Sequence, residues 1–449
     1  MAWGRRSLFR AVLLGFVAQV ALANADAAAD ADVKSKVDPP AAGSTEGLVY
    51  EAIDKQQVMT GNITTAKPGK KPAIDGWWNS KICTVSGEYC VFTNRRLQKG
   101  RGLAMVSRFE DFQKAERIEE YLNKGENKVE EEGLFTETEV VDKGIGITAT
   151  KNIRRGKKLM SWSPVLFIHT DFFQDVKKKS ERRRILEAAV AFLPDETRAK
   201  VDRQRIQGLK PGENQKTRSI EDIILGSPFE VNFGYEYGQE KHSRHYAHYP
   251  EMAVVQHNCR PNMAYHIDPN FAIRVTVARR TQGGEELTLA YIDPFWPQYK
   301  RQAWVQKRRG LGKPCNCQKC NPKGGDAEIK ESEERVKRIE EILAKLKNHD
   351  STDITEEMID EFLALVDKES MHAKLADFYE NAAMNYNYLG YDVKAKKYAD
   401  LAVQAGIIEE GPDSNSVIAN RIFASDIKGH FSYRFTLKRK RNKADKGKQ

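Results

Sequence analysis

The residues between Pro250 and Cys320 constrain the fold of this chain more than any other stretch. Three short motifs follow one another here: QHNCRPN at 256–262, GEELTLAY at 284–291 and CNCQKC at 315–320. Four of the six cysteines of the chain lie in this stretch. The fold therefore has to accommodate a cysteine-bearing turn, a strand-like segment and a tight group of thiols at close sequence spacing.

The cysteine spacing predicts a metal site. Cys315, Cys317 and Cys320 are three neighbouring thiols, which cannot all pair with one another, and structural zinc takes four soft ligands in a tetrahedron. Cys259, in the first motif, supplies the fourth thiol. We therefore expect a structural zinc site, with a disulfide among these cysteines as the alternative in an oxidising compartment.

These motifs resemble the SET domain of protein-lysine methyltransferases, followed by its cysteine-rich post-SET segment, over about residues 135–322. Further matches in family order are KGIG at 143–146 and Asn232 in VNFGYE. The cysteine spacing and the helical carboxyl-terminal region are most similar to the SET-and-MYND class, although the MYND finger has no counterpart here. The chain also resembles exported fungal SET-domain proteins.

The resemblance implies an α+β fold with a β-rich SET domain, made of small curved sheets and a pseudoknot. A helical insert is expected at about 172–223, and an all-α region should follow the post-SET zinc segment. The expected organisation is a signal peptide at 1–23, a linker at 24–72, a flanking region at 73–134, the SET domain at 135–300, the post-SET segment at 301–322, a tetratricopeptide-like helical region at 323–425 and a basic tail at 426–449.

The resemblance also assigns roles to individual residues. It implies S-adenosylmethionine as cofactor and Tyr291 as the catalytic residue that orients the reacting groups. Tyr235, Tyr237 and Tyr265 are candidates for the wall of a lysine channel, with ordinary packing as the alternative for each. The residues implied to bind the cofactor are Lys143, Gly144, Ile145, Gly146, Asn232, Gln256, His257 and Tyr291, and those implied to bind zinc are Cys259, Cys315, Cys317 and Cys320.

Two departures from the family pattern bear on activity. Gln256 stands where the family has asparagine, and its extra methylene moves the amide. Lys313 stands where an aromatic residue often stacks on the adenine. The leading hypothesis is a SET-type protein-lysine N-methyltransferase that acts on a protein of unknown identity. The alternative is an inactive SET-fold module for protein interaction in the secretory pathway.

The amino terminus predicts export. A basic start, the apolar run AVLLGFVAQV and a small-x-small site at 21–23 or 23–25 are typical of a secretory signal peptide. Asn62 lies in an Asn-Ile-Thr glycosylation sequon, and Cys83 and Cys90 are spaced for a small disulfide loop. We expect a secreted or secretory-pathway protein, with nucleus or cytoplasm as the alternative if the first segment is not a signal.

Charge and composition exclude some partners and classes of enzyme. The chain of 449 residues has a net charge of +10, much of which lies in the tail, so nucleic acid is expected to bind only through that tail. No later stretch is apolar and long enough to span a bilayer. The sequence has no nucleophile elbow, phosphate loop or His-Glu-x-x-His motif. We expect His242, His245 and His248 to be surface residues of a loop.

Overall fold

The computed structural model describes residues 76–117, 119–140, 143–205, 218–233, 243–308 and 314–439. The predicted signal peptide, the linker and the Asn62 sequon lie outside these ranges. So do Tyr235, Tyr237, His242 and Lys313, and residues 440–449 of the basic tail. None of the helices in the described ranges has both the length and the apolar character needed to cross a membrane.

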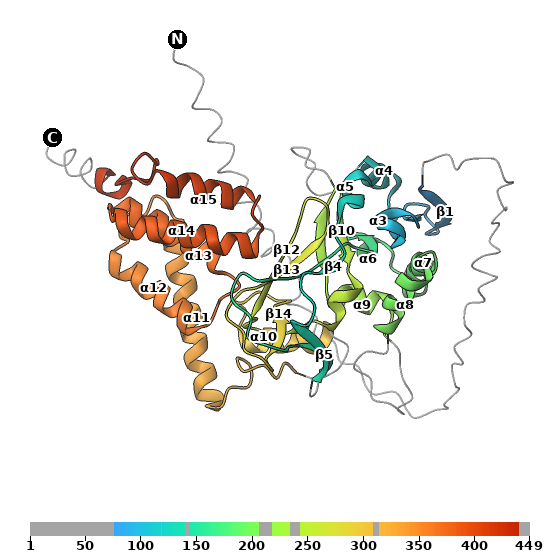
Figure 1. Cartoon of the computed structure of the whole chain (residues 1–449), viewed down its shortest axis with the longest axis horizontal. Helices are drawn as coiled ribbons and strands as arrows, with labels where there is room; N and C mark the ends of the chain where they lie inside the picture. The colour runs from blue at the N-terminus through green and yellow to red at the C-terminus, as the bar shows by residue number, and fades with distance from the viewer. Residues whose placement is uncertain are drawn as a thin grey trace, which may run out of the picture. The chain divides into compact units, whose positions relative to one another are not determined.

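A six-stranded sheet joins the flanking region to the centre of the molecule (Figure 1). Its order is β1-β2-β3-β8-β10-β9, and β3 runs parallel to β8 while the other neighbours are antiparallel. Val91, Ala104, Leu166 and Ile168 are buried in it. The strands are β1 (Trp78–Cys83), β2 (Cys90–Asn94), β3 (Leu103–Ser107), β8 (Leu166–His169), β9 (Phe229–Asn232) and β10 (Arg244–His248).

A disulfide closes the hairpin at the edge of this sheet. Cys83 ends β1, Cys90 begins β2, and their sulfur atoms are 2.01 Å apart. The pairing is the one that the sequence spacing predicted. It ties the first described strand to the rest of the sheet.

Two smaller sheets form the β-rich centre. Their orders are β11-β14-β6-β5 and β12-β13-β7-β4. Their buried side chains share one core, in which Ile147, Met263, Val275 and Leu287 are almost completely shielded from solvent. The strands are β4 (Lys128–Val129), β5 (Phe135–Val140), β6 (Gly144–Ala149), β7 (Lys158–Trp162), β11 (Gln256–His257), β12 (Met263–Ile267), β13 (Ile273–Val277) and β14 (Glu286–Leu289).

The first and second motifs of the sequence meet in this centre. β11 runs parallel to β14, with Gln256 opposite Thr288 and His257 opposite Leu289. The buried side chain of Asn262 fixes the crossing, because its Nδ2 donates to the Glu286 carbonyl at 2.8 Å and its Oδ1 accepts the Thr288 N–H at 2.8 Å. The turn that carries Cys259 is therefore held against the strand that leads to Tyr291.

The helices that follow β8 and precede β9 in the sequence cover the six-stranded sheet. They form the helical insert that was expected at about 172–223. α7 packs Ile185, Leu186 and Val190 against the apolar side chains of β2, β3 and β8. Ser219 caps the amino terminus of α9 in a capping box. Its side chain accepts a hydrogen bond from the Asp222 N–H, and the Asp222 side chain accepts one from the Ser219 N–H. The helices are α6 (Phe172–Asp175), α7 (Lys179–Ala191), α8 (Asp195–Arg203) and α9 (Ile220–Gly226).

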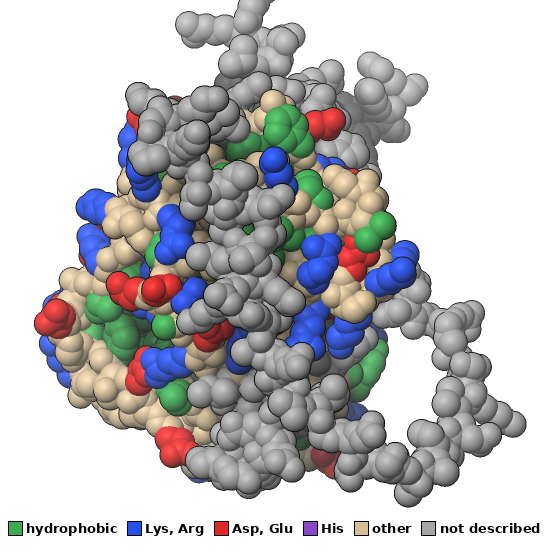
Figure 2. Space-filling model, turned by 90° about the vertical axis from the view of Figure 1, so that its right-hand side faces the viewer, with side chains coloured by type: hydrophobic (Ala, Val, Ile, Leu, Met, Phe, Trp, Pro, Cys, Tyr) green, Lys and Arg blue, Asp and Glu red, His purple; other side chains and the backbone are tan. Residues whose placement is uncertain are grey.

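The face with α7 and α8 carries mixed charge. Figure 2 shows Lys and Arg side chains interspersed with Asp and Glu where this face is not covered by undescribed residues. Arg182 pairs with Glu221 at 2.8 Å and Arg203 pairs with Glu137.

The carboxyl-terminal region is helical and has a core of its own. Ile342, Phe362, Phe378 and Tyr386 are buried in it. Gly390 ends α13 with φ +84°, a left-handed conformation that favours glycine, and α14 starts two residues later. The helices are α11 (Gly325–Lys347), α12 (Glu356–Lys368), α13 (Leu375–Leu389), α14 (Asp392–Glu409) and α15 (Asn415–Ser425), shown in orange and red in Figure 1.

One expectation about the histidines was wrong. His245 and His248 lie in strand β10 and are buried, rather than exposed on a loop. Nε2 of His245 is 2.8 Å from the Ser107 hydroxyl, and its Nδ1 is 2.9 Å from the Ser243 carbonyl. Ser107 lies far from His245 in the sequence and Ser243 directly precedes the strand, so a spacing of three residues could not reveal these partners.

Candidate active site

The glycine turn of KGIG at 143–146 enters β6 beside a shallow hollow. Gly144 has φ +80°, and a Cβ on Gly146 would lie 2.6 Å from a methyl of Val140. The close approach of β5 and β11 therefore requires glycine at 146. Lys143, just before the turn, extends to Glu286 of β14, where its Nζ lies 2.7 Å from Oε2.

Gln256 ties this turn to β11. Its Nε2 donates to the Ile145 carbonyl at 2.6 Å and to the Lys143 carbonyl at 3.3 Å. The extra methylene that distinguishes glutamine from the asparagine of the family gives the amide this reach. Gln256 is buried, and its amide holds the main chain of the turn.

The hollow has a volume of about 470 Å³ and lies between β5, β6 and β14 on one side and the cysteine loop on the other. This volume is within the range of small-molecule sites in proteins. Asn232 is at the end of β9 and does not line it. The lining residues are Thr138, Glu139, Val140, Lys143, Thr148, Asn258, Gly284, Glu286, Asn316, Cys317 and Gln318.

His257 links the tyrosine to the cysteines. Its Nδ1 accepts a hydrogen bond from the Tyr291 N–H at 3.2 Å, so the neutral ring carries its proton on Nε2. That Nε2 lies 3.3 Å from Sγ of Cys259. The buried imidazole therefore contacts both the Tyr291 main chain and Cys259, one through each ring nitrogen.

Tyr291 follows β14 and directs its hydroxyl to the main chain. The hydroxyl donates to the Val255 carbonyl at 3.1 Å, and the Met252 carbonyl lies 3.5 Å away. The Tyr291 ring packs edge-on against Phe229, with 6.1 Å between ring centroids. This bond orients the hydroxyl at the margin of an aromatic cluster.

The aromatic cluster is apolar and neutral. Phe229 also contacts Tyr265 and Tyr249 edge-on, with centroids 5.2 Å and 5.5 Å away. Burial raises the pKa of Tyr265 to about 12, and it raises the pKa of Tyr249 well above its ordinary value. These phenols therefore add no charge near Tyr291 at neutral pH.

The four predicted zinc ligands converge. Cys259, Cys315, Cys317 and Cys320 are buried, and their sulfur atoms all lie within 4.8 Å of one another. Two of them, those of Cys259 and Cys320, are 3.5 Å apart. Zinc–sulfur bonds of about 2.3 Å in a tetrahedron place sulfurs about 3.8 Å apart. All four cysteines are free of disulfides, so this group, here called the thiol cluster, has the geometry of a metal site.

Helix α10 (Gln298–Arg308) holds the loop of the thiol cluster by its side chains. Gln302 makes two hydrogen bonds with the main chain of Cys315, at 2.6 Å and 2.9 Å. Gln298 donates to the Cys320 carbonyl at 3.1 Å. These residues were not predicted from the sequence, although the spacing of Gln298, Arg301 and Gln302 places all three on one face of a helix.

Arg301 provides a test of whether a metal fits the thiol cluster. Its side chain is 1% exposed, and its Nε has no hydrogen-bond partner. Burial lowers the pKa of this guanidinium, but the charges of Cys259 and Cys320 outweigh burial and raise it overall. Four thiolates around Zn²⁺ carry a net charge of −2, which would offset this buried cation. The residues present therefore fit a tetrathiolate metal.

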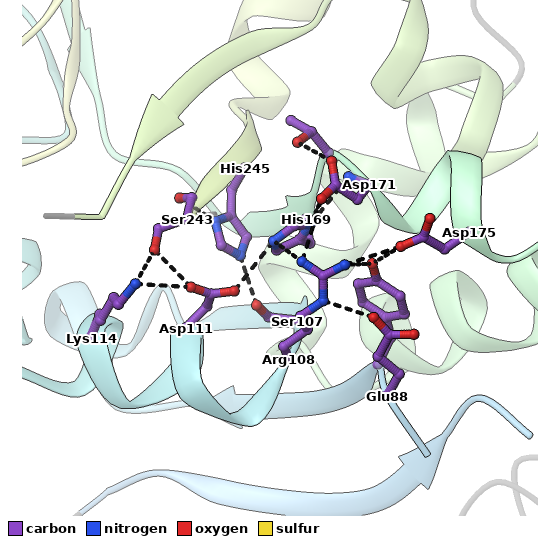
Figure 3. Close-up of polar contacts among 12 residues, drawn as sticks. Glu88, Ser107, Arg108, Asp111, Lys114, His169, Asp171, Asp175, Ser243 and His245 are labelled. Atoms are coloured by element: carbon purple, nitrogen blue, oxygen red, sulfur yellow. Dashed lines mark hydrogen bonds and ion pairs between the residues drawn. The ribbon is translucent and has the colours of Figure 1, made fainter. Parts of the chain in front are cut away.

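A second buried polar group, the polar seam, lies in the six-stranded sheet and consists of Ser107, Asp111, His169, Ser243 and His245 (Figure 3). Asp111 Oδ1 accepts from the Ser243 hydroxyl at 2.7 Å, and its Oδ2 lies 3.3 Å from Nε2 of His169. Burial opposes ionisation of Asp111, but its hydrogen bonds to His169 and Ser243 lower its pKa to about 2. The seam joins helix α4 (Phe109–Arg117) to β3, β8 and β10.

Comparison with known proteins agrees with this geometry. Residues 144–292 match the family model of the SET domain. The match begins at the glycine turn and ends one residue after Tyr291, so it includes Cys259 but stops before the other three cysteines. No curated protein matches the chain.

Proposed function

Because the chain contains a SET domain, we propose that it is an S-adenosylmethionine-dependent protein-lysine N-methyltransferase. The observation that carries this proposal is the position of Tyr291. Its hydroxyl is oriented by the Val255 carbonyl, and its ring borders the cluster of Phe229, Tyr249 and Tyr265. A neutral aromatic wall beside an oriented hydroxyl suits the transfer of a group to a desolvated amine.

The proposed cofactor site is the hollow at the glycine turn. Lys143 lines it, and the main chain of Gly144, Ile145 and Gly146 continues from there into β6. Gln256 holds the turn in place through its amide, and His257, the next residue of β11, holds the main chain of Tyr291; we assign both to the cofactor site from the family resemblance. We assign Asn232 to the same site from the family resemblance alone.

When bound, S-adenosylmethionine supplies an electrophilic methyl group on a sulfonium. The aromatic cluster excludes water and disfavours the lysine cation, which lowers the amine pKa from its ordinary value near 10.4. Tyr291 orients the amine by its hydroxyl and keeps its own proton, which the Val255 carbonyl accepts in a hydrogen bond. Alignment of the two reactants is the main contribution of these residues to the rate.

We also propose that the thiol cluster holds structural zinc. The metal would supply cross-linking of the turn at Cys259 with the loop at 315–320. That loop contributes Asn316, Cys317 and Gln318 to the wall of the hollow. The zinc site would thus shape the cofactor site without taking part in the reaction.

Two features support weaker proposals. Gln256 uses its amide to hold the turn, which favours the alternative of an inactive SET-fold module for protein interaction.

The disulfide between Cys83 and Cys90 favours an oxidising compartment and thus the secretory pathway. Location, glycosylation at Asn62 and the protein substrate remain predictions from the sequence.

Methyl transfer from labelled cofactor to a lysine-containing peptide array tests the proposed activity. We expect the wild-type chain to label a subset of peptides. Tyr291→Phe should lower that rate by about a hundredfold or more, since it removes the orienting hydroxyl. Tyr299→Phe is the matched control, because the Tyr299 side chain on α10 is mostly exposed. An array left unlabelled by wild-type protein that binds the cofactor would favour the interaction module.

A further inference from the structure

Glu369, just after α12 in the helical region, is a buried carboxylate that the proposed reaction does not use. Its side chain is 1% exposed. Within the helical region it accepts hydrogen bonds from the Ser332 hydroxyl at 2.9 and 3.0 Å and from Nε of Arg335 at 2.7 Å. Both of these partners lie on α11.

Glu369 also reaches both arms of the thiol cluster. Arg260 is the residue after Cys259, and its Nη2 lies 3.2 Å from Oε2 of Glu369. Nε of Arg260 donates to the main-chain carbonyl of Glu369 at 2.7 Å. Nζ of Lys319, between Cys317 and Cys320, donates to the same carboxylate oxygen. One residue therefore contacts the cysteine-bearing turn, the cysteine loop and α11 at once.

The contacts of Glu369 with these elements are ion pairs as well as hydrogen bonds. Three cations, Arg260, Lys319 and Arg335, surround the single carboxylate, and all three side chains are largely buried. Burial by itself would raise the pKa of Glu369, but Lys319, Arg335 and Arg260 together lower it. Removing one partner of a buried ion pair leaves the other charge without compensation, which is strongly unfavourable.

The same two arms form part of the proposed cofactor site. Asn258 precedes the cysteine of the turn, and Asn316, Cys317 and Gln318 precede Lys319; all four line the hollow. Motion of either arm away from Glu369 would change the wall of the hollow. The chain thus has a continuous physical path from α12 to the cofactor site.

We propose that Glu369 is a positioning residue through which the helical region holds both cysteine-bearing arms in place and thereby sets metal retention and cofactor affinity. The part about the cofactor rests on the proposed function, whereas the part about the arms does not. Arg260 and Lys319 are the partners through which Glu369 acts.

The test uses the full chain with Glu369→Gln, which keeps the shape of the side chain and removes its charge. The first readout is the rate at which the thiol cluster reacts with a disulfide reagent under native conditions. We expect this rate to rise about tenfold or more, because the arms separate more often from α12. The second readout is the calorimetric Kd for S-adenosylmethionine, which should rise several-fold.

Glu380→Gln is the matched control. Glu380 is a half-buried carboxylate of the same helical region, and it accepts hydrogen bonds from Asn420 at 2.9 Å and Ser416 at 3.2 Å, away from the cysteine arms. We expect this variant to lose stability without any change in thiol reactivity or cofactor affinity. Should Glu369→Gln fail to fold, Lys319→Met removes one cation only and should give an intermediate increase in thiol reactivity.

The outcomes separate the two proposals. Thiol reactivity and cofactor affinity of folded Glu369→Gln equal to those of Glu380→Gln would overturn the role of Glu369. If Lys319→Met has to replace Glu369→Gln, unchanged thiol reactivity in Lys319→Met would overturn that role in the same way. Faster thiol reaction in a chain whose wild-type form binds no cofactor would keep Glu369 as the holder of the arms and overturn the proposed function instead.

Discussion

The polar seam and the thiol cluster are both buried polar groups that join distant parts of the chain, and they differ in what they leave unsatisfied. In the seam, Asp111 is bonded to Ser243 and faces His169, and His245 is bonded to Ser107 (Figure 3). Beside the thiol cluster, the buried Nε of Arg301 has no acceptor, and four thiols crowd one another. The residues of the seam satisfy one another's hydrogen bonds, whereas the geometry of the thiol cluster fits a bound metal.

This difference separates a structural role from a functional one. A buried polar network that satisfies its own members fixes the register of the elements that it joins. A buried group with excess positive charge and converging ligands is arranged for something that binds. Only the thiol cluster also borders the hollow, through Cys317. We therefore assign the seam to the fold and the thiol cluster to the site.

The largest expected effect is on metal content. The wild-type chain should contain about one zinc per molecule, and Cys259→Ser should lose it, because a structural site needs its fourth thiolate. Elemental analysis of the purified protein measures the ratio. Quantitative oxidation of the four cysteines to disulfides in the wild-type chain would contradict a metal site. The thiol cluster would then be a structural group like the polar seam.

The next effect concerns the seam. Asp111→Ala should lower the free energy of unfolding by about 3–5 kcal/mol, since it leaves Ser243 and Lys114 without their carboxylate partner. Denaturant unfolding measures this loss. Methyl transfer per folded molecule should stay near the wild-type value. A selective loss of activity without loss of stability would show that the seam takes part in function.

A smaller effect should appear in the pH dependence of stability. Burial lowers the pKa of His245 to about 3 from its ordinary 6.5, so the unfolded chain binds this proton more strongly. Stability should therefore fall, by an amount on the order of a few kcal/mol, as the pH drops from about 6.5 toward 3. The low pKa of Asp111 adds a further loss between its ordinary 3.8 and about 2.

The helical region should respond in the opposite direction. Burial raises the pKa of Glu409 to about 7 from its ordinary 4.5, so its contribution to stability is present below pH 4.5 and declines as the pH rises to 7. Denaturant unfolding of the Glu409→Gln variant across this range should show the decline reduced. An unchanged pH profile in this variant would contradict the assignment.

The sequence predicted the local parts of the site well. Three cysteines within six residues and a fourth in a Pro-Asn turn predicted a converging group of thiols. The motif order at Gly144, Cys259 and Tyr291 predicted a SET domain, which the family match confirms. These features are legible because each depends on spacing within a short segment.

The parts that the sequence could not predict depend on partners far along the chain. His245 meets Ser107 across 138 positions, and Glu369 meets Arg260 across 109. Polar residues such as Arg301 and Gln302 look like an ordinary solvated helix face until the thiol cluster packs against them. Their burial follows from tertiary packing, which residue spacing does not encode.

The hollow at Lys143 and the glycine turn is the proposed site for S-adenosylmethionine. Calorimetric titration of the full chain with this cofactor measures that binding. We predict saturable binding to one site per chain, with affinity kept in the control Tyr299→Phe and weakened in Glu369→Gln. Absence of binding at millimolar cofactor to a folded, metal-loaded chain would contradict the proposal.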